Sequence, residues 1–364
     1  MKDRDQKAKA LKYSVSKGWF PQLEVDVHPP KALGKGVTLM TDIDVFASMP
    51  DDFYGYRNIV FDCKTGVRES AVNRALWLRG VLDRMHAEQG VCILRKNIIE
   101  LDHKLVATKM GIILLAEDEF DIFARSTSNR YDEKLGYVAN IEAWEKLFGL
   151  REKYPALAPA INFTRSLYWM LDDAAEACRK TLAFVREVRA ELDPAKDEHL
   201  AIALDLASLF ARALAVLAVT VFKAYLHPKK QADLDEAMKV LLYGGREAYE
   251  HRNNLYKLVN KERQGKDVVI GDLSLPDWDR FIQLFRQLLD APLDVAQTPL
   301  ILRDVAFSYL MGSVDRTFVK GLCVASPQAG RFALLTVGYL FKAAKLPLEF
   351  LKKSEEVLIP LLEK

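Results

Sequence analysis

The chain has 364 residues, of which 50% are hydrophobic and 28% charged, and its formal net charge is +2. This composition is that of an ordinary folded globular protein and excludes a disordered chain. The balanced charge excludes a strongly basic body that coats nucleic acid without preference, although a local basic groove remains compatible with it. The length is sufficient for two domains.

The four cysteines are widely spaced and form no CxxC or Cys/His pattern: Cys63, Cys92, Cys178 and Cys323. The sequence therefore predicts neither a zinc site nor a disulfide framework, and scattered free thiols are typical of a reducing cytoplasm. The polar and basic N-terminal stretch contains no apolar core of signal-peptide length. We expect a cytoplasmic protein.

Up to about residue 125, extended and helical segments alternate. The first helix is expected over residues 3–19, and further helices over 69–88, over 102–110 and after Glu117. Strands are expected at 22–28, 36–47, 57–64, 90–96 and 111–116, with a loop rich in Pro, Asp and Gly between the second and third. Strands that alternate with helices in this way predict a central sheet flanked by helices.

From about residue 140 the strand signals end and amphipathic helical stretches follow. They span 140–150, 161–193, 197–226, 231–263, 275–290, 298–312, 328–344 and 346–363. Residues 206–226 are apolar enough for a membrane span, but Arg212 lies inside them. A charge near the bilayer centre is costly, so we expect a buried helix and no membrane partner. The sequence thus predicts an α/β domain at 1–138 and an all-α domain at 139–364.

Two predicted strands carry charged residues where apolar ones are usual. Side chains two apart share a strand face, so Asp42 and Asp44 point one way in "TDIDVFA", and Asp62 and Lys64 share a face in "FDCKTG". If the strands pair as a hairpin, Asp44 approaches Asp62. Two close carboxylates repel each other, and one takes up a proton unless a cation lies between them. Mg²⁺ prefers oxygen ligands of this kind.

This pattern resembles the PD-(D/E)xK, or restriction-endonuclease-like, superfamily over about residues 5–130. The resemblance rests on Asp44 in the second strand, on Asp62 and Lys64 in the third, and on the helix and buried strand that follow. It implies Mg²⁺ or Mn²⁺ as cofactor, with Asp44, Asp62 and the carbonyl of Cys63 as metal ligands and Lys64 as a catalytic residue. It also implies hydrolysis of nucleic-acid phosphodiester bonds, DNA more than RNA, in defence or repair. Many members carry a Glu on the first helix, which this helix lacks.

Two other functions remain open. The missing Glu and the large helical half favour an inactive nuclease fold that binds nucleic acid or a partner protein, and the helical domain could serve a partner or a homo-oligomer. Arg246 and His251, five residues apart, match the spacing of helical HEPN-type ribonucleases, in which Arg holds phosphate and His moves a proton. A structural ion pair between Asp44 and Lys64, without metal, is the simplest alternative.

Overall fold

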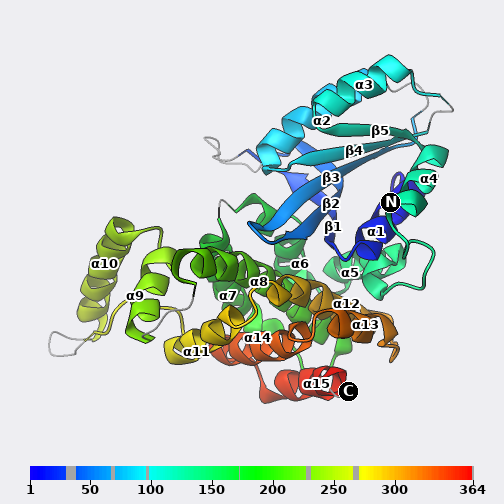
Figure 1. Cartoon of the computed structure of the whole chain (residues 1–364). Helices are drawn as coiled ribbons and strands as arrows, with labels where there is room; N and C mark the ends of the chain where they lie inside the picture. The colour runs from blue at the N-terminus through cyan, green and yellow to red at the C-terminus, as the bar shows by residue number, and fades with distance from the viewer. Residues whose placement is uncertain are drawn as a thin grey trace.

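The computed structural model describes residues 1–29, 38–66, 70–95, 98–171, 173–226, 231–264 and 270–362. Figure 1 shows a twisted sheet with helices on both sides, standing on a broad layer of helices formed by the rest of the chain. The N-terminal part is therefore α/β and the remainder helical, in agreement with the fold class predicted from the sequence at this level.

The N-terminal part contains five strands and four helices within the described residues. The strands are β1 (Phe20–Val27), β2 (Thr41–Asp51), β3 (Gly55–Lys64), β4 (Gln89–Leu94) and β5 (Ile112–Ala116), and they lie in the sheet in chain order. The first three form an antiparallel meander, whereas β3, β4 and β5 are parallel. The parallel connections contain helices α2 (Ala71–Met85) and α3 (Leu101–Lys109), as parallel strands require.

The two faces of the sheet are covered by different helices. On one face, Tyr13 of α1 (Arg4–Ser16) meets Phe61 of β3 and Phe120 of α4 (Glu117–Thr127) edge to face. On the other, Leu78 of α2 packs so closely on β4 that a Cβ at Gly90 would lie 2.6 Å from it. Glycine at this position permits the close approach of helix and strand.

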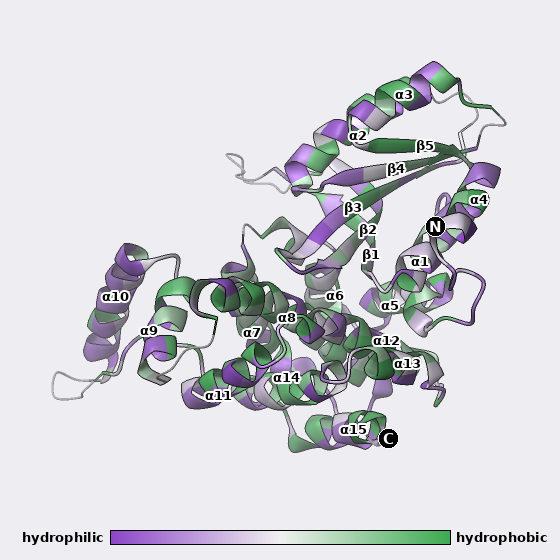
Figure 2. Cartoon of the chain, in the orientation of Figure 1, coloured by the Kyte–Doolittle hydropathy of each residue, from purple (hydrophilic) through white to green (hydrophobic). Residues whose placement is uncertain are grey.

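The helical part is arranged around one long buried helix, α8 (Asp197–Tyr225). Its length and apolarity would suffice to cross a membrane, but 89% of its most apolar 18-residue window is buried inside the protein. Figure 2 shows this apolar centre, with α8, α12 and α14 largely green and α10, at the far end, largely purple. The other helices of this part within the described residues are α5 (Ile141–Lys153), α6 (Ala158–Arg165), α7 (Ala174–Val188), α9 (Gln231–Leu242), α10 (Arg246–Gln264), α11 (Trp278–Leu289), α12 (Thr298–Leu310), α13 (Thr317–Ala325), α14 (Ala329–Ala344) and α15 (Leu348–Leu358).

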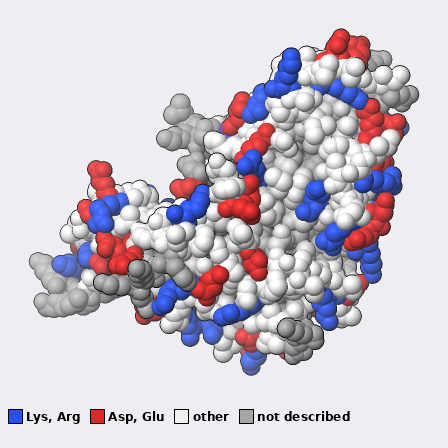
Figure 3. All heavy atoms as spheres, viewed as in Figure 1, with Lys and Arg blue, Asp and Glu red and all other residues white. Residues whose placement is uncertain are grey.

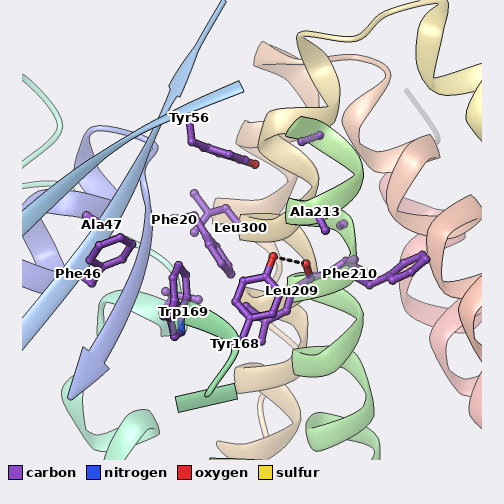
Figure 4. Close-up of a cluster of buried hydrophobic side chains, with 14 of the residues drawn as sticks. Phe20, Phe46, Ala47, Tyr56, Tyr168, Trp169, Leu209, Phe210, Ala213 and Leu300 are labelled. Carbon is purple, nitrogen blue, oxygen red and sulfur yellow. Dashed lines mark hydrogen bonds between the residues drawn. The ribbon is translucent and has the colours of Figure 1, made fainter. Parts of the chain in front are cut away.

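One hydrophobic core runs through both parts. Figure 4 shows aromatic rings of the sheet facing the helical layer, and Phe46 of β2 lies 5.0 Å, centroid to centroid, from Trp169. Tyr56 of β3 donates a hydrogen bond to the carbonyl of Ala296, and Tyr168 donates one to the carbonyl of Leu209. The hydroxyl groups of these two buried tyrosines therefore both have a partner, as burial of a phenol requires.

The strand and helix boundaries depart from the sequence predictions in four places within the described residues. The predicted loop 48–56 is instead a tight hairpin, because Asp51 accepts bonds from the backbone N–H groups of Phe53 and Tyr54 and so closes the turn. The predicted helix 161–193 is divided between α6 and α7, and 231–263 is divided at Gly244 and Gly245, which adopt positive φ. Helix α13 was not predicted. The predicted strand start at 36 lies outside the described residues.

Candidate functional site

Three carboxylates lie in a row across β1, β2 and β3. Asp44 and Asp62 stand one position beyond Val45 and Phe61, the last paired residues of the β2–β3 ladder. Glu24 lies between the pairs Leu23–Val45 and Val25–Ile43, which places it opposite Asp44. The backbone of Glu24 has φ 58°, a left-handed conformation that is uncommon for a non-glycine residue and interrupts the regular strand.

Asp44 is almost fully buried and is held from three directions. Its Oδ1 lies 2.9 Å from Nζ of Lys7 on α1. Its Oδ2 accepts a hydrogen bond of 2.7 Å from the backbone N–H of Cys63 and one of 3.2 Å from Nζ of Lys64. Lys7 also donates to Glu24, so a single ammonium group bridges the carboxylates of β1 and β2.

Asp62 is buried as well, and a guanidinium group holds it on both oxygens. Arg74 of α2 donates from Nε to Oδ2 at 2.9 Å and from Nη2 to Oδ1, the two-pronged geometry that gives the strongest carboxylate pairs. Lys64 Nζ lies 3.4 Å from Oδ1 of Asp62. The ammonium of Lys64 therefore stands between the two acids, and the sequence-predicted trio Asp44, Asp62 and Lys64 lies together.

We call the six residues Glu24, Asp44, Asp62, Lys7, Lys64 and Arg74 the sheet-end cluster. It contains three acids and three bases, so its formal charge is zero. Burial raises the pKa of Asp62, while the hydrogen bonds from Arg74 and the charge of Lys64 act against that rise. Burial alone would lower the pKa of Lys7 and of Lys64, but the adjacent carboxylates outweigh it and raise both. Both lysines therefore stay charged at neutral pH.

Sequence reasoning missed three members of the cluster: Glu24, Lys7 and Arg74. Lys7 is one of several lysines on the first helix, where a lysine is usually solvated, yet it is only 2% exposed. A signal was present, because Lys7 shares a helical face with the buried Ala10 and Ser14. Arg74 lies in the same way beside Ala71 and Leu78 on α2, with its guanidinium 4.0 Å from the ring centroid of Trp77. A charged residue on an apolar helical face is buried when the helix packs, and it then needs an oppositely charged partner. This pattern would have indicated that Lys7 and Arg74 contact buried acids.

An open cavity of about 300 Å³ lies beside the cluster. It lies between the sheet and the helical part, where α5 contributes Phe148 and Arg151 and α6 contributes Arg165. Arg165 is occupied, since it donates to the carbonyl of Glu24 at 2.7 Å and to Asp26 at 3.1 Å. Arg151 donates only to the carbonyl of Phe148 and to Asn162, and is not among the ion pairs of the described residues. Lys64 and Lys7 of the cluster both line this cavity. The side chain of Lys64 is 16% exposed, whereas that of Lys7 is only 3% exposed.

The residues of the cluster do not fit a divalent metal in this arrangement. Each oxygen of Asp44 and Asp62 already has an N–H or ammonium partner from the chain itself. No group of three or more His, Cys, Asp or Glu residues suited to a metal is present among the described residues. The ammonium of Lys7 reaches Asp44 from the first helix, where the resemblance leads one to expect a Glu. For the oxygens to turn to Mg²⁺ or Mn²⁺, Lys7 and Arg74 would have to withdraw.

The remaining candidate residues have other surroundings. The thiol of Cys63 is buried in the core and its pKa is raised well above the usual range by burial, as for a small hydrophobic residue. Asp42 is exposed and pairs in the ladder with Asp26. Arg246 and His251 both lie on the exposed helix α10, and Arg246 donates to Glu236 at 2.7 Å. All four cysteines are free and buried.

Neither the family models, the curated proteins nor the solved structures contain a match to this chain. Figure 3 shows Lys and Arg interspersed with Asp and Glu over the viewed face, in keeping with the balanced net charge.

Proposed function

We propose that this chain is a nucleic-acid-binding protein on a nuclease-like α/β fold, and that the sheet-end cluster holds phosphate without cutting it. One observation carries the proposal: the oxygens of Asp44 and Asp62 are held by Lys7, Lys64, Arg74 and a backbone N–H, so the chain supplies the cations itself. This arrangement satisfies the charge of the buried acids, which otherwise would be protonated or metal-bound.

The cations that face the cavity provide the contact with phosphate. Lys64 is anchored between two carboxylates, yet part of its side chain is exposed. Arg151 and Lys2 line the same cavity, which the acids Asp3 and Asp42 also line. A phosphodiester entering there would accept hydrogen bonds from ammonium and guanidinium groups, which provide most protein–phosphate contacts. We expect modest affinity that falls with salt, because few phosphates are neutralised.

A second candidate is the metal-dependent nuclease that the sequence resemblance implies. The convergence of Asp44, Asp62 and Lys64 at the open end of the β2–β3 hairpin favours it. Under this candidate, Lys7 and Arg74 would have to withdraw from the acids before Asp44, Asp62 and the carbonyl of Cys63 could hold Mg²⁺, and Lys64 would be the catalytic residue. DNA is then the expected substrate in preference to RNA.

A binding and cleavage panel separates the two candidates. Fluorescence anisotropy with single-stranded DNA, double-stranded DNA and RNA is measured in EDTA, and cleavage is followed in Mg²⁺ and in Mn²⁺. We expect binding in EDTA, weakened by about tenfold in Lys64→Met and in Arg151→Met and unchanged in the exposed control Lys320→Met, with no cleavage.

Three results would reject the proposal. Cleavage that requires Mg²⁺ or Mn²⁺ and is abolished by Asp62→Ala would establish the nuclease instead. An absence of binding to all three nucleic acids would reject both candidates. Cleavage of RNA in EDTA that is lost in His251→Ala would instead support a metal-independent ribonuclease site at Arg246 and His251 on α10.

A further inference from the structure

A second cavity, of about 340 Å³, lies toward the β2–β3 turn and away from the sheet-end cluster. Its floor is formed by Phe46 and Asn58 of the sheet, and its walls by the end of α2, the start of α7 and the middle of α8. The volume is within the range of small-molecule sites. We call it the arginine–tyrosine pocket, after Arg84, Arg212, Tyr54 and Tyr56, which line it.

Two arginines in this pocket have no acidic partner among the residues that the structure describes. Neither Arg84 nor Arg212 is among the ion pairs of the described residues. Asp173 is the one carboxylate among the described residues that line the pocket, and it caps α7 by accepting the backbone N–H of Glu176 at 2.6 Å. A pair of partly buried guanidinium groups without a carboxylate leaves a local positive charge that an anion would satisfy.

Arg212 is the charge that interrupts the otherwise apolar sequence of α8, and the fold holds it in a fixed position. Its Nε donates to Ser48 at 3.0 Å and its Nη2 to Asn58 at 3.2 Å. Its guanidinium also lies 5.1 Å from the ring of Tyr56 and 5.0 Å from that of Trp169. These contacts position the cation in advance, so that little side-chain freedom is lost when a ligand binds.

Arg84, near the end of α2, has an unused donor. Its Nη2 donates to the carbonyl of His28 at 3.0 Å, whereas its Nε is buried and has no hydrogen-bond partner in the described part of the chain. A buried guanidinium N–H without an acceptor is unfavourable. A bound anion that reached this nitrogen would supply the missing acceptor.

Aromatic side chains line the same pocket. Trp169 and Tyr56 are nearly buried and form its inner wall, as part of the ring cluster in Figure 4. Tyr54 in the β2–β3 turn also lines the pocket and is 62% exposed. Flat aromatic surfaces beside arginines are the surroundings in which nucleobases stack and phosphates bind.

We propose that the arginine–tyrosine pocket binds one nucleotide, with its base against the Tyr54 and Trp169 rings and its phosphate on Arg84 and Arg212. The same chemistry is presented by a free nucleoside monophosphate and by the phosphorylated end of a strand. The inference does not depend on the sheet-end cluster, since it rests on different residues, and either site can fail without the other.

Calorimetric titration of the full chain tests the proposal. The probes are adenosine 5′-monophosphate, cytidine 5′-monophosphate, adenosine, inorganic phosphate, and a single-stranded oligonucleotide with and without a 5′-phosphate. We expect a monophosphate or the phosphorylated strand to bind at least about tenfold more tightly than adenosine or phosphate alone, since base and phosphate are both recognised. Binding of the monophosphates identifies a free nucleotide, and preference for the phosphorylated strand identifies a strand end.

Matched variants assign the binding to this pocket. Tyr54→Ala and Arg84→Gln are expected to weaken binding by about tenfold. The neighbouring exposed Phe53→Ala, and Arg79→Gln on α2, should stay within about twofold of the parent chain. All four side chains are partly exposed, and circular dichroism confirms that each variant is folded. The absence of binding by every probe, or equal binding by all folded variants, would overturn the proposal.

Discussion

Two buried charge systems in this molecule differ in one respect, which is access to solvent. In the helical part, Arg303 of α12 is 0% exposed and donates to Asp205 of α8 at 2.6 Å and to the carbonyl of Pro21 at 2.8 Å. Its guanidinium also lies 4.1 Å from the ring of Phe20. The sheet-end cluster is equally balanced in charge, but Lys64 and the adjacent cavity connect it to solvent.

The difference indicates what each system does. A closed pair that links two helices to a strand of the sheet fixes the two parts of the chain together, and nothing outside can reach it. An open cluster also carries a desolvation cost, but it leaves the ammonium of Lys64 accessible, which is the arrangement expected of a binding site. The following four predictions test this contrast.

The largest effect is expected at the closed pair. Arg303→Met leaves the buried Asp205 carboxylate without its cation, and we expect the free energy of unfolding to fall by about 3–5 kcal/mol. Urea denaturation measures it, with the exposed Arg331→Met as control. A loss of less than about 1 kcal/mol would show that Asp205 is compensated by other groups.

Lys7→Met is expected to have the next largest effect, about 2–4 kcal/mol in urea denaturation at neutral pH, because Glu24 and Asp44 lose the ammonium between them. The loss should shrink as the pH falls, since buried carboxylates without a cation take up protons. Lys12→Met on the same helix is the control. A loss independent of pH would contradict the electrostatic explanation.

Asp304 of α12 should make stability depend on pH. Burial raises the pKa of this carboxyl to about 7, although backbone N–H groups of Val138 and Tyr137 act against the rise. A folded-state pKa above the unfolded value contributes stability at low pH that is lost as the pH rises through about 7. Asp304→Asn keeps an acceptor for Val138 and should be more stable than the parent chain at about pH 8, by about 2 kcal/mol.

The measurement for Asp304→Asn is the melting temperature between about pH 5 and pH 8.5. The parent chain should lose stability across this window relative to the variant. Parallel curves for the two proteins would show that Asp304 does not titrate there.

The smallest effect on stability is expected for Lys64→Met, about 1 kcal/mol in urea denaturation, because the ammonium is partly solvated and Lys7 and Arg74 remain on the acids. Its effect should appear in nucleic-acid binding instead. A stability loss as large as that of Lys7→Met would show that Lys64 mainly stabilises the fold and would contradict its role in binding.

The sequence was sufficient to predict the succession of strands and helices up to Thr127 and the helical remainder, because alternation and helical spacing are strong local signals. It also predicted that Asp44, Asp62 and Lys64 would meet, since strand faces and hairpin pairing determine this. It did not predict Lys7 and Arg74 as partners. Their contacts depend on how α1 and α2 pack over the end of the sheet, and packing of that kind is not encoded in local periodicity. The tight turn at Asp51 was missed because Pro50 indicated a loop.

The carboxylate of Asp44 also acts as a substitute for a main-chain acceptor, since it receives the amide hydrogen of Cys63 just where the two strands part. Asp44 therefore contributes a hydrogen bond between the two strands, which we call the rung, as well as a negative charge. Asparagine there would keep the rung and remove the charge, whereas alanine would remove both. Amide hydrogen exchange at Cys63 in the two variants would separate the effect of the lost hydrogen bond from the effect of the lost charge.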